Sequence, residues 1–355
     1  MKFFKLQIDK SKLLEIINLK FSVFYPIKDF ISNKDFKSII EDYHLYNNAF
    51  FPIPILFSIF KKDYEKIKKI DQLKIFFFNN FVCNLNIKSI YKINKSKYFY
   101  KIFRTKNYNH PGLHNFINSG NYYIDGKIGN FNHDILKKIN FFKPSEIKKK
   151  IKRNNLKTIA GFHTRNAPHR AHEWIHQFGL KNCEGLLIQP LIGQFRSTEY
   201  NEKIIIKTNK YLIDNFYSKQ KVFFSVLNTY PRYAGPREAL LHAIIRRNFG
   251  CTHFLVGSDH AGIGKFYKTY ESQKICLNYE KQLNIKILAF KEPYLCNHCK
   301  NIINSKCLSC KNKKISKTNI RGQYLRSFIA KNKKIPEEFM RKEISSLLSK
   351  NSMIR

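Results

Sequence analysis

Short apolar runs and longer amphipathic segments alternate along the second half of the chain. The runs TIAGF, EGLLIQPLIG, KVFFSVLN and THFLVGSD have the length of buried strands and are rich in β-branched and aromatic residues. The segments between them space their apolar residues as helices do: HRAHEWIHQFGL, EKIIIKTNKYLIDNFY and GPREALLHAIIRRNFG. This alternation predicts a parallel sheet with helices on both faces, and such sheets bind ligands beyond the carboxyl ends of their strands.

Residues 1–142 have a different pattern and predict a separate, β-rich domain. The runs KIFFFNNFV and KYFYKIF are β-like, and Pro52 and Pro54 predict that FFPIPILFSI is an edge strand or a kinked segment. Glycines and asparagines in HPGLHNFINSG and NYYIDGKIG predict a loop and a hairpin. No cluster of reactive side chains stands out here, and we interpret His110 and His114 as structural.

The remaining boundaries follow from local signals. The sequence Pro144-Ser145-Glu146 predicts a helix start. We therefore expect a central α/β domain over 143–313, with a Cys-rich insert at 294–311, and a small helical tail over 314–355. A chain of 355 residues has room for about two domains and a small appendage.

The charge of the chain is strongly positive, with 65 Lys and Arg against 25 Asp and Glu and a formal net charge of +40. Such a surplus first suggests nucleic acid. The lysines are spread along the whole chain, however, which favours a basic surface that attracts small anionic ligands over nucleic-acid binding.

Other classes of protein are excluded by what the chain lacks. No apolar run of about 18 residues predicts a membrane span. Charges interrupt the first residues too early for a secretory signal. The cysteines are too sparse for a secreted disulfide scaffold, so we expect a cytoplasmic protein.

The first chemical cluster is GFHTRNAPHRAHE, residues 161–173, where a predicted strand ends at Phe162 and a helix begins near Pro168. The free backbone N–H groups of a helix start form an anion site. Arg165, His169 and His172 add donors there, and the two histidines, three residues apart, face one side of the first turn. The pattern predicts phosphate binding; metal ligation or a solvated helix end are the alternatives.

Two further segments carry similar chemistry. In THFLVGSDHAGIGKFY a predicted strand runs into Gly257, Asp259 and His260, where glycine allows close approach and the polar side chains suit a base or sugar. In KISKTNIR we expect Ser316 and Thr318 to cap a following helix, with Arg321 directed at a nearby phosphate. An ordinary capped basic helix is the alternative for this last segment.

Four cysteines are spaced as two C-x-x-C pairs: Cys296, Cys299, Cys307 and Cys310. Each pair wraps one face of a tetrahedral ion, so the spacing predicts a Zn²⁺ site, with disulfides or chance spacing as alternatives. Four thiolates close the coordination sphere, so the site is expected to be structural. We expect His298, inside the first knuckle, to point outward.

These motifs together resemble the ATP sulfurylase (sulfate adenylyltransferase) family of the nucleotidylyltransferase superfamily. The resemblance rests on HTRNAPHRAHE, GSDHAG at 257–262, YAGPREALLHAIIRRNFGCTHFLVG and ISKTNIR, in the family's order. It covers about residues 145–345, with weaker matches at PIPI and HPG in the first domain.

The resemblance implies a PUA-like N-terminal β domain, a Rossmann-like catalytic domain, and a small C-terminal helical subdomain. It implies direct in-line attack of sulfate on the α-phosphorus of MgATP, giving adenylyl sulfate and pyrophosphate without a covalent enzyme intermediate. It also implies a homo-oligomer, and some bacterial members carry a similar zinc site. Mg²⁺ would bridge the phosphates, mostly through waters.

Residue roles follow from position in the family motifs. His163, Arg165 and the backbone of Ala261 would hold sulfate. The ATP phosphates and nucleoside would be held by Asn166, His169, His172, Gly257, Asp259, His260 and Arg321.

Three positions depart from the family pattern. His163 replaces the usual Gln, Ser258 replaces the usual Arg, and LIGQFRSTEY has Ser-Thr-Glu where a Gly-Asp sequence is common. A lost charge-assisted contact costs about 1.5–3 kcal/mol. Either His163 and Arg196 compensate, or the acceptor is another oxyanion or a phosphorylated metabolite. We expect sulfate; a catalytically inactive homologue with an RNA-binding or scaffold role is the non-enzyme alternative.

Overall fold

The computed structural model describes residues 2–193, 199–305, 310 and 316–354. Its internal contacts divide the chain into two compact units. The first unit contains residues up to 144 together with 231–249 and 259–285, and the second contains 145–230, 250–258 and residues from 286 onward. The chain therefore passes from one unit to the other several times.

The first unit is built on a five-stranded sheet in the order β1-β3-β4-β5-β2. Its strands are β1 (Phe3–Gln7), β2 (Phe57–Ile59), β3 (Gln72–Phe77), β4 (Asn80–Lys92) and β5 (Tyr122–Gly129). Only β1 and β3 run parallel among these pairs. β2 follows Pro52 and Pro54 and lies at the edge of the sheet, which confirms the edge strand predicted from the prolines.

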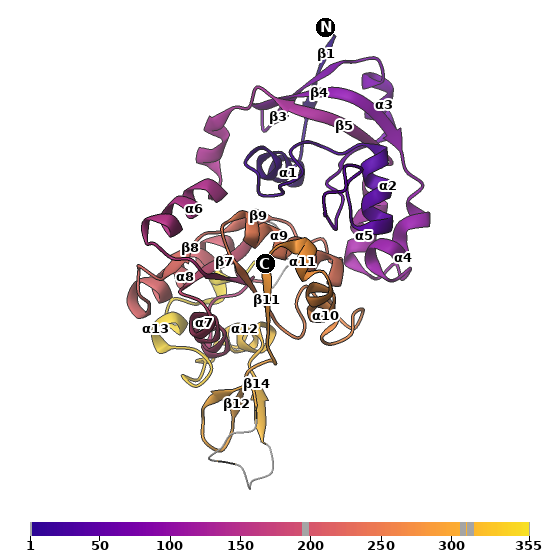
Figure 1. Cartoon of the computed structure of the whole chain (residues 1–355). Coiled ribbons are helices and arrows are strands. Elements are labelled where there is room, and N and C mark those ends of the chain that lie inside the picture. The colour runs from indigo at the N-terminus through magenta and orange to yellow at the C-terminus, as the bar shows by residue number, and fades with distance from the viewer. Residues whose placement is uncertain (1, 194–198, 306–309, 311–315, 355) are drawn as a thin grey trace. The chain divides into compact units, whose positions relative to one another are not determined.

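Helices complete this unit. α1, which carries the buried Leu13 and Ile17, lies beside the sheet (Figure 1). α1 spans Lys10–Lys20. The other helices are α2 (Asn33–Asp42), α3 (Lys61–Ile67), α4 (Phe99–Phe103), α5 (Pro111–Asn118), α9 (Pro236–Asn248), α10 (Glu271–Asn278) and α11 (Glu280–Leu283). Two 3-10 turns lie at Lys95–Tyr98 and His133–Lys138.

Three predictions for this unit are wrong. NYYIDGKIG forms the single strand β5 rather than a hairpin. KYFYKIF is helical rather than β-like, because Phe99, Ile102 and Phe103 repeat at helical spacing and are buried on one side of α4. HPGLHNFINSG contains α5 rather than only a loop. His110 Nδ1 accepts the backbone N–H of Leu113 at 3.1 Å, and proline at the first helical position needs no N–H.

The second unit contains the predicted parallel sheet, in the order β11-β10-β6-β7-β8 with β9 also pairing β7. Its strands are β6 (Ile159–Thr164), β7 (Gly185–Gly193), β8 (Val222–Phe224), β9 (Leu227–Thr229), β10 (His253–Val256) and β11 (Lys286–Ala289). The sequence predicted one strand where β8 and β9 are two, and β11 was not predicted. The parallel sheet itself is confirmed.

Helices and a buried core hold this sheet. α7 (Arg170–Asn182) packs on β6 and β7, α8 (Glu202–Phe216) packs on β7 and β8, and α6 (Pro144–Arg153) begins at the predicted helix start. The core between them includes Ala160, Phe162, Ile175, Leu186, Ile188, Ile213 and Leu255. All nine residues of β7 are buried, as expected for a strand covered on both faces.

The end of the chain forms a small sheet and a helical tail. β12 (Tyr294–Cys296) pairs antiparallel with β13 (Ile302–Ile303) and β14 (Lys317–Asn319), and the hairpin projects beyond α12 in Figure 1. The tail has α12 (Gly322–Ala330), α13 (Lys342–Ser345) and a 3-10 turn at Lys350–Ser352. Among the described residues, no helix combines the length and apolar character that crossing a bilayer requires.

Candidate active site at the carboxyl edge of the sheet

The strand order places two of the predicted motifs next to each other. β6 pairs with β7 on one side and with β10 on the other, so the order of strands reverses between β6 and β10. Arg165 and Asn166 follow the end of β6, and Gly257 and Ser258 follow the end of β10. In doubly wound sheets, ligands bind at this reversal point.

His169 and His172 lie together at the start of α7. His169 is the N-cap, and its Nδ1 accepts the backbone N–H of His172 at 3.4 Å. The two rings are stacked, with centroids 3.6 Å apart and planes at 23°. The predicted pairing of these histidines on the first turn is therefore seen, although α7 begins at Arg170, two residues later than expected.

Burial keeps these histidines neutral. It lowers the pKa of His169 to about 3, and it lowers the pKa of His172 well below its ordinary value with added repulsion from His169 and His176. A neutral imidazole donates one N–H. Since His169 Nδ1 accepts a backbone bond, its proton lies on Nε2, which leaves that N–H as a donor.

Arg165 and Asn166 each have a charged partner that sequence reasoning missed. Arg165 Nη2 pairs with a carboxylate oxygen of Glu199, which follows the end of β7. Arg326 of α12 donates from Nη1 to Asn166 Oδ1 at 2.6 Å. Burial lowers the pKa of Arg326, while Tyr200 and Glu199 act in the opposite direction.

Gly322 at the start of α12 makes the contact with Asn166 possible. A Cβ at this glycine would lie 2.5 Å from Asn166 Oδ1 and 2.7 Å from its Cγ. No local motif marks Arg326 or Gly322. The only sequence feature that could have pointed to them is their position shortly after the predicted site residue Arg321. Arg321 is the N-cap residue of α12, and its side chain makes no capping bond.

The loop after β10 is tied to the loop after β11. Ser258, at the position where the resembling family has Arg, donates its hydroxyl to Glu292 Oε2 at 2.9 Å. Gly257 packs against Phe290, whose Cζ would lie 3.3 Å from an added Cβ. His163 is half-buried on β6, paired in register with Gln189 of β7.

The rest of this motif belongs to the first unit. A Cβ at Gly262 would lie 1.9 Å from Asp259 Oδ1, so a larger residue here would displace the Asp259 side chain from its place over the turn. Ala261 has a left-handed φ of 57°. His260 Nε2 lies 3.0 Å from His242 Nδ1, and burial, followed by repulsion from Arg246, lowers the pKa of His260 to about 3.

The predicted caps of the last helix are wrong. Both hydroxyls bond to Asn297, just after β12: Thr318 donates to Asn297 Oδ1 at 2.9 Å, and Ser316 Oγ accepts from Asn297 Nδ2 at 2.9 Å. Residues 317–319 form β14, and α12 begins only at Gly322, so both hydroxyls lie too early in the chain to cap it.

Three of the four predicted metal ligands lie together. The Sγ atoms of Cys296, Cys299 and Cys310 are all within 4.8 Å of one another, and Cys307 lies outside the described residues. Lys300, with a φ of 57°, donates its N–H to the carbonyl of Cys296 at 2.9 Å and closes a tight turn. The backbone N–H groups of Cys299 and His298 lower the pKa of Cys296, which favours a metal-binding thiolate.

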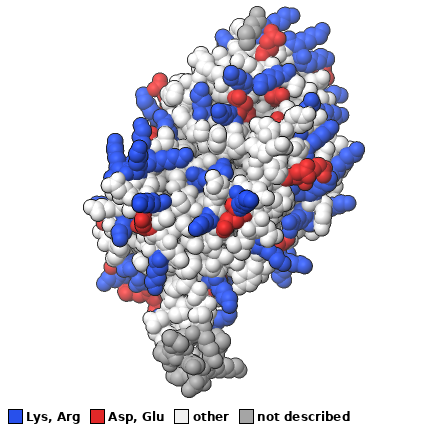
Figure 2. All heavy atoms as spheres, viewed as in Figure 1, with Lys and Arg blue, Asp and Glu red and all other residues white. Residues whose placement is uncertain are grey.

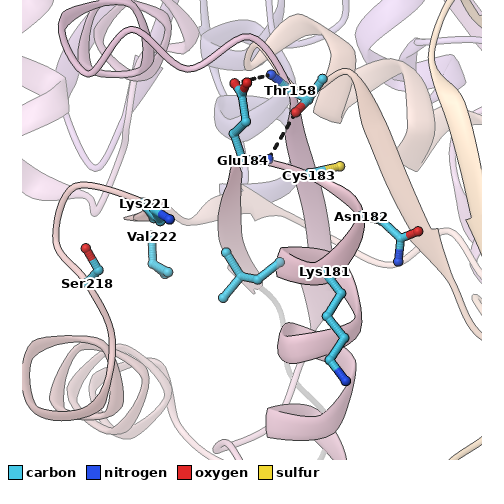
Figure 3. Close-up of a pocket in the computed structure, with 9 residues that line it drawn as sticks. Thr158, Lys181, Asn182, Cys183, Glu184, Ser218, Lys221 and Val222 are labelled. Atoms are coloured by element: carbon cyan, nitrogen blue, oxygen red, sulfur yellow. Dashed lines mark hydrogen bonds between the residues drawn. The ribbon is translucent and has the colours of Figure 1, made fainter.

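A cavity of about 490 Å³ lies at the opposite, amino edge of the sheet (Figure 3). Its wall includes Glu184, whose carboxylate accepts the Thr158 N–H at 3.2 Å, and Cys183, whose pKa is raised by burial to about 11. These groups fix the starts of β6 and β7. No predicted site residue lines this cavity.

On the face drawn in Figure 2, the basic residues do not gather into one block. Lysine and arginine side chains are scattered over the face drawn in Figure 2, with acidic side chains between them. This distribution agrees with a generally basic surface.

Comparisons with known proteins agree with the motifs. A family model described as ATP-sulfurylase matches residues 140–351, and one described as a PUA-like domain matches residues 2–133. The chain is 33% identical over 344 residues to the sulfate adenylyltransferase of Ignicoccus hospitalis, covering 96% of this chain and 89% of the relative. It is 32% identical over 346 residues to that of Pyrococcus abyssi, covering 97% and 89%.

The fold also matches a solved structure, described as a hexameric APS kinase from Thiobacillus denitrificans. The TM-score is 0.71 at 16% sequence identity, and the match covers 97% of this chain but 62% of that one. Together these matches confirm the predicted fold class, a PUA-like part followed by an α/β part.

Proposed function

The chain belongs to the ATP-sulfurylase family, and we propose how its residues carry out the family reaction. It is a nucleotidyltransferase of the sulfate adenylyltransferase type, which transfers the adenylyl group of ATP to sulfate and releases pyrophosphate. One sulfate oxygen attacks the α-phosphorus, the bond from that phosphorus to the β-phosphate bridging oxygen breaks, and pyrophosphate leaves. No side chain is needed as a nucleophile, so the protein contributes positioning and charge stabilisation.

We assign the phosphates of MgATP to the start of α7 and the turn before it. His169 and His172 are neutral donors, and the first N–H groups of the helix add the positive end of its dipole. Asn166 is the third phosphate ligand, held by Arg326. Donors fixed by the fold in this way stabilise the charge that develops on the leaving pyrophosphate.

We assign sulfate to Arg165, with His163 and the backbone of Ala261 as further partners. Arg165 is half-buried and pairs with Glu199 through Nη2, so we propose that sulfate binds the other N–H donors of the guanidinium. The nucleoside is assigned to Gly257, Asp259 and His260, and Arg321 is assigned to a phosphate. These roles rest on the motif positions and on the chemistry of each group.

The observation that carries the proposal is the pairing of β6 with β10 at the reversal of strand order. It brings the turn at Arg165 and Asn166 to the same sheet edge as Gly257 and Ser258. Only that edge of the described sheet combines a helix start, two stacked histidines and an arginine.

The test is sulfate-dependent release of pyrophosphate from MgATP by the purified chain, with molybdate and phosphorylated metabolites as competing acceptors. We expect turnover with sulfate, and loss of at least a hundredfold in His169→Ala. Gln177→Ala, on the exposed side of the same helix, serves as the matched control. Pyrophosphate release that does not respond to sulfate would reject sulfate as the acceptor.

A structural metal fits the Cys cluster. Three thiolates within 4.8 Å suit Zn²⁺, and Cys307 is proposed as the fourth ligand. Bound Zn²⁺ would cross-link β12 to the following turn and supply folding energy rather than chemistry. Mg²⁺ is proposed to enter with ATP as part of the substrate.

The remaining assignments are proposals of the same kind. We propose a homo-oligomer, by analogy with the similar hexameric structure. We propose a cytoplasmic protein, because the cysteines are too sparse for a secreted disulfide scaffold. We likewise propose that the chain is divided by function into an N-terminal domain over 1–142, a catalytic domain over 143–313 and a C-terminal subdomain over 314–355.

A further inference from the structure

A third histidine continues the row behind the His169–His172 pair. His176 lies one turn further along α7, is fully buried, and has its ring 6.5 Å and 26° from that of His172. Phe162 of β6 packs edge-on against both rings, with centroid distances of 5.2 and 4.5 Å. The Tyr217 hydroxyl lies 3.0 Å from His176 Nδ1.

Two buried nitrogens in this row have no hydrogen-bond partner among the described protein groups: His172 Nδ1 and His176 Nε2. Leaving such atoms unsatisfied costs about 1–3 kcal/mol each, and buried waters usually satisfy them. With ring centroids 6.5 Å apart the two rings are too distant for a direct nitrogen-to-nitrogen bond, and one water that makes two bonds of about 2.8 Å can span a gap of this order.

The tyrosine sets the direction of the bonds. Burial raises the pKa of Tyr217, so the hydroxyl keeps its proton, and within the described residues the ring nitrogen of His176 is its one hydrogen-bond partner. The arrangement that uses this proton has the hydroxyl donating to His176 Nδ1. A neutral imidazole that accepts at Nδ1 carries its proton on Nε2.

We propose that Tyr217, His176 and one buried water form a hydrogen-bonded chain that fixes the tautomer of His172. His176 Nε2–H donates to the water, and the water donates to His172 Nδ1. The proton of His172 is thereby held on Nε2, which is the nitrogen left to donate to a phosphate. His176 and Tyr217 are positioning residues, and their effect on catalysis rests on the proposed function of His172.

The chain explains why an imidazole rather than an aliphatic residue is buried at position 176. A leucine would pack against Phe162 equally well and would avoid an unsatisfied nitrogen. In an imidazole, the bond accepted at Nδ1 from the Tyr217 hydroxyl fixes the proton on Nε2. Active sites commonly fix a histidine tautomer in this way, through the nitrogen that faces away from the substrate.

The first test is spectroscopic and needs no substrate. In protein carrying ¹⁵N-histidine, with the His172 signals assigned from a His172→Asn variant, we expect His172 with its proton on Nε2 and a bare Nδ1. Tyr217→Phe removes only the hydroxyl and should give a mixture of both His172 tautomers. A proton on Nδ1 in the parent protein, or an unchanged tautomer in Tyr217→Phe, overturns the proposal.

The second test is kinetic and separates positioning from packing. Tyr217→Phe and His176→Leu should lower kcat about tenfold and leave KM for MgATP within about twofold. His176→Gln should recover most of kcat, because its amide accepts from the tyrosine and donates to the water. Tyr211→Phe should match the parent, because Tyr211 lies on α8, the helix that ends just before Tyr217, and its hydroxyl makes no hydrogen bond to the described residues.

The outcomes are distinguishable. Equal losses in His176→Gln and His176→Leu would reduce the row to packing and overturn the proposal. If the parent protein shows no sulfate-dependent turnover, the proposed function fails, while the tautomer of His172 still decides whether the chain exists.

Discussion

Replacing Gly322 with alanine should separate stability from activity. Gly322 is the first residue of α12, and its φ is not in the left-handed region, so alanine fits the backbone. Removing a helical glycine stabilises a helix by up to about 1 kcal/mol. By this measure alone, the variant should be at least as stable as the parent.

The added methyl nevertheless meets Asn166. It would lie 2.5 Å from Oδ1, 2.7 Å from Cγ and 2.8 Å from Nδ2, whereas an ordinary contact requires about 3.5 Å. The amide must therefore move by about 1 Å. This movement breaks the 2.6 Å bond from Arg326, which as a charge-assisted bond contributes about 1.5–3 kcal/mol. A shift of 1 Å in a positioning group lowers a rate by about a hundredfold.

The assay is kcat/KM for MgATP in the pyrophosphate-release reaction, measured beside the free energy of unfolding in urea. We expect kcat/KM to fall about a hundredfold, while the free energy of unfolding falls by no more than about 2 kcal/mol, because removal of the glycine partly offsets the bond lost from Arg326. Gly129→Ala is the control, because its nearest neighbour, Asn86 Nδ2, would be 3.6 Å away. Activity of Gly322→Ala within threefold of the parent would refute the role assigned to Asn166.

Three further predictions concern metal, pH and the first unit. Elemental analysis should find about one zinc per chain, lost in Cys299→Ser but retained in Cys183→Ser; absence of zinc from the parent would reject the metal site. The free energy of unfolding should fall as the pH decreases from about 6.5 toward 3. In the unfolded chain His169 and His176 take up protons near their ordinary pKa, whereas in the folded protein burial holds both pKa values at about 3. A flat profile above pH 5 in urea titrations would contradict this. Arg232→Leu should cost about 3–5 kcal/mol by leaving Glu15 buried without its ion pair, and Arg232→Leu combined with Glu15→Leu should recover much of it in a double-mutant cycle.

The parallel sheet could be predicted because its signal is local. Each strand of the parallel sheet except β11 comes from an apolar run that the sequence shows between helical segments, and β7 is buried along its whole length. β11 was missed because its four residues begin with an exposed lysine and follow a short polar turn. KYFYKIF was misread because a seven-residue run fits both a strand and two helical turns, and only the packing of Phe99, Ile102 and Phe103 decides.

The site was predictable only as far as its motifs reach. The His169–His172 stack follows from their spacing on one helix, and the strand ends follow from the order of elements. The partners of these residues come from distant parts of the chain: Arg326 lies 160 residues from Asn166, and Glu199 lies 34 residues from Arg165. Sequence spacing carries no information about such contacts, which arise when separate helices and strands pack together.

The overall charge of +40 does not replace the arginine that the family usually carries at position 258. Ser258 preserves the geometry of its loop through Glu292, but it brings no positive charge. Fields from exposed lysines fall off within about 8 Å at physiological salt, so scattered surface charge adds little at a reacting phosphate. Compensation must come from a cation fixed close to the site, and Arg326, half-buried and bonded to Asn166, meets that requirement. We therefore propose that Arg326 of α12 supplies the charge that Ser258 does not bring.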